Sequence, residues 1–151
     1  MLHNIVFTDN IFILSRTLGL ISQSLHLVFA EEVFSKKFEL DILFCGETIK
    51  KIFEKLNSQE HLHDYLDTMK CLYSCSSRFV QILANLESEN RGIFESDPEK
   101  ISKLRIEHEE IRLNISKKVR NTNVDAEIIN IVSDMELTEL LDFGNPVSTR
   151  N

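Results

Sequence analysis

Glycine and proline are scarce in this chain of 151 residues, which contains four glycines and two prolines. From Asp9 to Glu89 there is no proline, and the only glycines are Gly19 and Gly46. Residues that break helices therefore do not mark the boundaries of the elements in this part of the chain. The boundaries have to be predicted from the spacing of the apolar residues.

Cysteine is also rare. Cys45, Cys71 and Cys75 cannot all pair within one chain, and their spacing matches no zinc motif. The sequence therefore predicts free, mostly buried thiols and a reducing, cytoplasmic location. It predicts neither a metal site nor a cofactor.

Basic residues and long apolar runs are also scarce. The chain has 17 basic and 24 acidic residues, a formal net charge of −7, and its densest basic cluster is Lys117-Lys118-Val119-Arg120. This balance argues against nucleic acid or an anionic membrane as the main partner. No run reaches the roughly 18 apolar residues of a membrane span. The apolar first 30 residues lack a positively charged start and contain Asp9 and Arg16, so they are interpreted as folded domain and not as a signal peptide.

The remaining composition is that of a globular protein, with 42% apolar and 27% charged residues. A chain of this length can bury a core without disulfides or metals. The sequence predicts one domain over residues 1–146. Gly144-Asn145-Pro146 should end its last helix, and residues 147–151 are expected to form a flexible tail.

The stretch from Ser58 to Asn90 is expected to organise the fold. Its apolar residues recur at helical spacing, and Arg78 is the only charge between Cys71 and Leu86. A helix exposed to solvent would carry more charge, so this one is expected to be covered on more than one side. The residues that form its stripe are Leu62, Leu66, Met69, Tyr73, Ser76, Val80 and Leu83.

Two helices are predicted before this stretch. An apolar arm, Leu2 to Phe7, precedes a helix that Thr8 or Asp9 can cap and whose apolar stripe runs from Ile11 to Val28. A second stripe runs from Phe34 to Leu56, passes through Gly46, and predicts a helix that ends near Asn57.

Signals for helix starts and stops are clearer after residue 90. Arg91-Gly92 indicates a loop, and Ser96-Asp97-Pro98-Glu99 is typical of a capped helix start. The apolar seam of this helix runs from Ile101 to Val119, Asn121-Thr122-Asn123 predicts a turn, and a last helix is expected from Asp125 to Asp142. The sequence as a whole therefore predicts an all-α bundle of four to five helices.

An α+β fold with a small sheet in residues 1–46 is the alternative. Phe38, Leu40, Ile42 and Phe44 alternate as in a strand, and two other short apolar runs could pair with them. With Thr8-Asp9-Asn10 after the first strand, this opening resembles that of a receiver domain. The resemblance implies a degenerate receiver that uses Asp9, because the second acidic residue is missing and Cys45 stands where an aspartate should close the third strand.

His108 is the single residue with the clearest chemical interest. Glu107-His108-Glu109 resembles the phosphoacceptor box of a histidine kinase, which implies a phosphotransfer bundle with His108 as the phosphoacceptor. His108 also falls on the apolar seam beside Leu104 and Ile111, which predicts a histidine packed in the core. Glu60 and His63 form one E-x-x-H pair, but a carboxylate-bridged metal site needs two such pairs, so a solvated helical turn is expected.

The last predicted helix is the best candidate for a partner site. Leu137-Thr138-Glu139-Leu140-Leu141, followed by Phe143, forms a short acidic amphipathic helix that can lay leucines in a groove or close the bundle of the protein itself. We find no phosphate-binding loop or nucleophile motif, so an enzyme is not supported. The sequence predicts a cytoplasmic interaction or regulatory module that binds another protein or a second copy. The alternatives are a two-component signalling module and a small-ligand-binding bundle.

Overall fold

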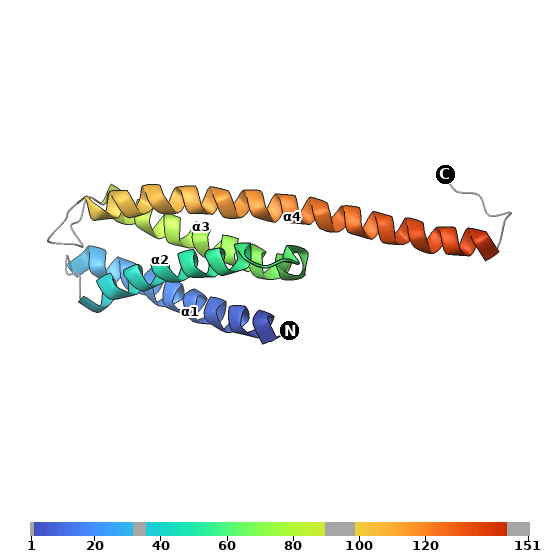
Figure 1. Ribbon diagram of the computed structural model, residues 1–151. Coiled ribbons are helices and arrows are strands. Elements are labelled where there is room, and N and C mark those ends of the chain that lie inside the picture. The colour runs from blue at the N-terminus through green and yellow to red at the C-terminus, as the bar shows by residue number, and fades with distance from the viewer. Residues whose placement is uncertain (1, 32–35, 90–98, 145–151) are drawn as a thin grey trace.

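The computed structural model describes residues 2–31, 36–89 and 99–144 (Figure 1). This part of the chain forms four α-helices and one short 3-10 helix and contains no strand. The prediction of an all-α fold is therefore confirmed. The elements are α1 (Leu2–Glu31), α2 (Lys36–Asn57), η1 (Leu62–Tyr65), α3 (Leu66–Ser88) and α4 (Lys100–Gly144).

The four helices pack side by side, and each runs antiparallel to the one before it (Figure 1). α3 contacts α1, α2 and α4, and its pairing with α4 is the most extensive in the bundle. This position explains why the sequence of α3 carries so little charge, since a helix with three neighbours keeps only a narrow face in water. Its buried residues are Met69, Leu72, Cys75, Ser76, Phe79, Val80, Ile82, Leu83 and Leu86.

The sheet expected as an alternative in residues 1–46 is wrong for the residues that the structure describes. Phe38 and Ile42 are buried, whereas Leu40 and Phe44 are 52% and 43% exposed. The buried series continues through Cys45 at helical spacing, so the period of 3.6 residues wins over the alternation. The receiver-like layout is excluded with the sheet.

The apolar arm before the first predicted helix is part of that helix. α1 begins at Leu2, and Phe7 is buried with its ring edge-on to Tyr65 at 5.5 Å between centroids. No proline or glycine precedes Gly19, so nothing in residues 2–7 interrupts a helix and a cap at Thr8 is not needed to start one. The helix therefore starts earlier than the sequence pattern predicted.

The turn predicted at residues 121–123 is also wrong. α4 runs without interruption for 45 residues, and Thr122 is only 4% exposed and continues the buried seam. Asparagine and threonine each cost a helix only a few tenths of a kcal/mol relative to better helix formers. In the absence of glycine and proline, that cost is too small to stop a helix that still packs on the bundle.

Other boundaries agree with the sequence. α2 ends at Asn57 as predicted, and α4 begins at Lys100, directly after the predicted cap and proline. The predicted loop at Arg91-Gly92, the cap at Ser96 and the tail at residues 147–151 lie outside the described residues.

Among the described residues, none of the helices has the length and apolarity needed to cross a membrane.

α4 is longer than the bundle. In Figure 1 its first half lies along α3, and its second half extends past the ends of the other helices. We call residues 123–144 the projecting half of α4. The predicted last helix, Asp125 to Asp142, is thus the projecting half of a single long helix.

Candidate functional site

His108 lies in the core, where α2, α3 and α4 meet. Only 1% of its surface is exposed, and its ring stands edge-on to Phe79 with centroids 4.8 Å apart and an interplanar angle of 83°. A Cβ at Gly46 would come within 3.1 Å of Nε2 of His108. The missing side chain of Gly46 therefore makes the room that the imidazole fills, and this explains a glycine in the middle of α2.

Burial lowers the pKa of His108 below its ordinary value. Glu107 and Glu47 oppose this shift by stabilising the charged ring, whereas Lys50 adds to it. Among the described residues, Nδ1 of His108 has no hydrogen-bond partner, and the same holds for Oγ of Ser76. The structure thus places His108 as a neutral core residue. Its proposed role as a phosphoacceptor stays a prediction, and it would require the ring to leave this position.

An ion pair lies beside His108 at the surface. Nζ of Lys50 is 2.9 Å from Glu107 on α4 and 3.9 Å from Glu47 on its own helix. The hydrogen bond to Glu107 raises the pKa of Lys50. The pair joins α2 to α4, which otherwise have few contacts. Its role is to help hold these two helices in place, and it does not indicate a catalytic function.

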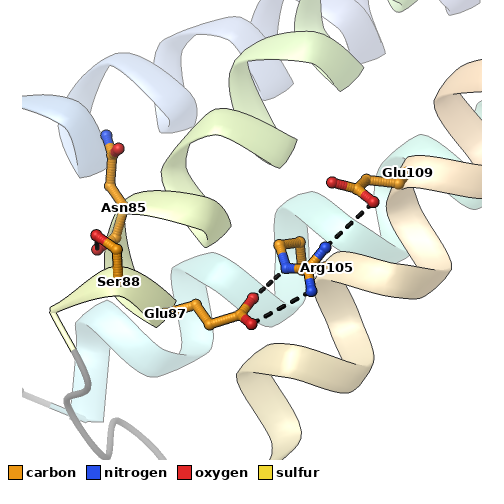
Figure 2. A network of polar contacts seen from close by, with 5 residues as sticks. All are labelled: Asn85, Glu87, Ser88, Arg105 and Glu109. Carbon is orange, nitrogen blue, oxygen red and sulfur yellow. Dashed lines mark hydrogen bonds and ion pairs between the residues drawn. The ribbon is translucent and has the colours of Figure 1, made fainter.

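A second charged network joins the end of α3 to the start of α4. Figure 2 shows Glu87 reaching Nε and Nη2 of Arg105, whose Nη1 lies 3.1 Å from Glu109. The hydrogen bond from Arg105 lowers the pKa of Glu87. Arg105 therefore acts as a clamp between two helices, and its charge is already engaged by two carboxylates.

An open pocket of about 610 Å³ lies where α4 leaves the bundle beside η1. Glu60 and His63, the residues of the E-x-x-H pair, both line it, and both are exposed. Its lining residues are Glu60, Leu62, His63, Lys118, Asn121, Thr122, Asp125 and Ile128. Nowhere in the described part of the chain do three or more potential metal ligands come together.

The cysteines divide into two groups. All three are free, and Cys45 and Cys75 are buried as predicted, whereas Cys71 is exposed. The sequence predicted mostly buried thiols, and Cys71 departs from that prediction because Leu72 and Cys75 occupy the buried face of α3 and Cys71 lies outside it. Burial raises the pKa of Cys45 to about 12 and also raises that of Cys75.

An apolar row on α4 faces solvent, and the sequence pattern did not single it out. Its members are more than half exposed although they lie on the helix with the largest contact to α3. They fall on the side opposite to the buried seam of Ile101, His108 and Ile115. We call Ile106, Leu113, Val124 and Ile128 the outer row of α4.

The predicted partner site lies in the projecting half of α4. The backbone at Leu137, Leu140, Leu141 and Phe143 is helical, and their side chains lie outside the part that the structure describes. Whether these leucines contact a partner stays a prediction. What Figure 1 does show is that this part of α4 lies beyond the ends of the other helices, so it is not the closing element of the bundle.

The chain is similar to a protein of Treponema pallidum (strain Nichols) described as uncharacterized, with 26% identity over 150 residues that cover 94% of this chain and 75% of that protein. No family model matches the chain. No solved structure matches it either.

Proposed function

We propose that this protein is a non-enzymatic protein-interaction module whose contact element is the projecting half of α4. The observation that carries the proposal is that a helix of 45 residues continues past the end of the bundle it packs on. A helix in water is stabilised mainly by packing of its apolar face, so a long extension rich in isoleucine and leucine calls for a partner surface.

The composition of the projecting half supports this proposal. Residues 125–144 contain nine large apolar residues and six acidic ones, and no lysine or arginine. Val124, near the start of the same half, is 52% exposed. Apolar residues at helical spacing with a single sign of charge are typical of helices that dock on another protein.

The core offers little to support an enzyme. His108 is buried against Phe79, and the charges of Lys50 and Arg105 are paired with carboxylates. These are stabilising positions, and none of the three residues lines the pocket beside η1. Phosphotransfer through His108 and ligand binding beside η1 remain alternatives without a specific observation in their favour.

Site-specific photocrosslinking tests the proposal. A photoreactive amino acid replaces Ile128 on α4 in one variant and Leu40 on α2 in the other, and the two positions are matched at 53% and 52% exposure. Both variants are expressed in the native cells and irradiated. We expect a discrete crosslinked product from position 128, formed either with another protein or with a second copy of this chain. We expect none from position 40. Equal crosslinking at the two positions, or none at either, would contradict the proposal.

A further inference from the structure

The projecting half of α4 continues the line of the outer row. Counted at 100° per residue, Val124 and Ile128 share a face with residues 131 and 135 further along the helix. Positions on this face follow one another at intervals of four and three residues, which is the spacing of a coiled-coil seam. The series is Lys117, Asn121, Val124, Ile128, Ile131, Met135, Thr138 and Asp142.

The residue types in this series are arranged symmetrically about its centre, with opposite charges at the two ends. Its centre holds four apolar residues, the next position outward is Asn121 on one side and Thr138 on the other, and Lys117 and Asp142 form the two ends. If a second α4 lies antiparallel on the first, each end of the series meets the opposite end of its partner. Lys117 then faces Asp142 of the second copy, and Val124 faces Met135.

The charges on the rest of α4 also favour antiparallel pairing. Residues 111–124 carry four basic and no acidic residues, whereas residues 125–144 carry six acidic and no basic residues. Parallel pairing would bring acidic segments together, and like charges at such positions destabilise a helix pair. Antiparallel pairing places the basic segment of each copy beside the acidic segment of the other.

The bundle leaves this face open for a second copy. Lys117 and Asn121 are exposed, and Val124 and Ile128 are more than half exposed, because the buried seam of α4 is on its other side. A partner helix can therefore lie along α4 from Lys117 onward without displacing α3. The overlap would span about 26 residues, or about 39 Å at 1.5 Å per residue.

We infer that the partner of the projecting half is a second copy of this chain, which pairs through α4 in antiparallel orientation. This inference rests on the proposed function, since it names the occupant of the same contact element. The two bundles then lie at opposite ends of the paired helices. Such a two-fold interface uses the same surface on both subunits, so each contact occurs twice.

Charge reversal tests the orientation. We measure the dimerisation constant of the full chain by sedimentation, with circular dichroism as a check of folding. Lys117→Glu should weaken association roughly tenfold because two attractive contacts become repulsive in each dimer. Adding Asp142→Lys to Lys117→Glu should restore it, since the two reversed ends meet again. In a parallel dimer, like ends would meet and the double variant would gain nothing, which would overturn the inference.

Disulfide trapping tests which residues of the two α4 helices face each other, and it changes no charge. In a Cys71→Ser background, which removes the exposed thiol, a Val124→Cys chain is mixed with a Met135→Cys chain under mild oxidation. We expect the mixed disulfide between the two chains to dominate. A predominance of links between identical positions would contradict antiparallel pairing. A matched control is Leu40→Cys in place of Val124→Cys, which should give no mixed disulfide.

Failure of this inference can be distinguished from failure of the proposed function. A chain that remains monomeric at high concentration, while position 128 crosslinks to a different protein, would refute self-association and leave α4 as a contact element. A monomer without crosslinks from position 128 would refute both.

Discussion

The environment of His108 predicts that stability depends on pH in a specific way. In the unfolded chain a histidine has a pKa near 6.5, and in the folded protein burial lowers that value for His108. The unfolded state therefore binds more protons as the pH falls below about 6.5, and the folded state loses stability over that range. The stability that His108 contributes as a neutral ring is complete above this pH.

The magnitude follows from the proton linkage. The limiting slope for one group is about 1.4 kcal/mol per pH unit, so the loss attributable to His108 between pH 7.5 and 5.5 is at most about 1.4 kcal/mol. Glu107 and Glu47 favour the charged ring and reduce this loss, whereas Lys50 increases it. The range stays above the isoelectric point of about 5.2, where solubility would fall.

His108→Leu provides the comparison. At pH 7.5 this variant should be as stable as the wild type or more stable, because leucine removes a buried nitrogen without a hydrogen-bond partner, which costs about 1–3 kcal/mol. The edge-on contact with Phe79 that is lost contributes only about 0.5–1.5 kcal/mol. The advantage of the variant should grow as the pH falls.

Urea unfolding at several pH values, followed by circular dichroism, measures this difference directly. His108→Phe serves as a second variant without a titrating group, and it should show the same change with pH although its packing differs. If the wild type and both variants lose stability in parallel, the ring of His108 keeps its ordinary proton affinity. That outcome would indicate an exposed ring and would revive its proposed role as a phosphoacceptor.

Three further predictions concern packing and charge. A thiol reagent should modify Cys71 quickly and Cys45 only on unfolding, and rapid loss of more than one thiol per chain would contradict the buried positions. Leu83→Ala should lower the free energy of unfolding by about 2–5 kcal/mol in urea titrations, and a loss below about 1 kcal/mol would contradict its full burial. Glu87→Gln should lower the melting temperature, and less so in high salt, because it breaks the pair with Arg105; a salt-independent effect would contradict this origin.

The sequence predicted the fold class and the central position of α3 because both depend on strong periodicity. The low charge between Cys71 and Leu86 was enough to indicate a helix with several neighbours, and the structure shows three. The end of α2 at Asn57 was predicted for the same reason. These features are local consequences of apolar spacing.

The errors arose where local preference competes with packing. Asn121 and its neighbours favour a turn in isolation. Thr122 is nevertheless buried in a helix that already packs on α3, and this packing keeps the segment helical. The predicted turn divided α4 in two and hid the continuity of the series from Lys117 to Met135. The signal was present in the heptad spacing, which becomes visible only when the two segments are read as one helix.

The central position of α3 has a consequence for how the chain folds. α1 and α2 precede α3 in the chain, α4 follows it, and each packs on it, so neither the segment before residue 58 nor the segment after residue 99 can bury a core without it. Folding should therefore be a single cooperative event in which no helix pair persists alone. Native-state hydrogen exchange should show the slowest amides in α3, at a rate set by global unfolding of the whole domain.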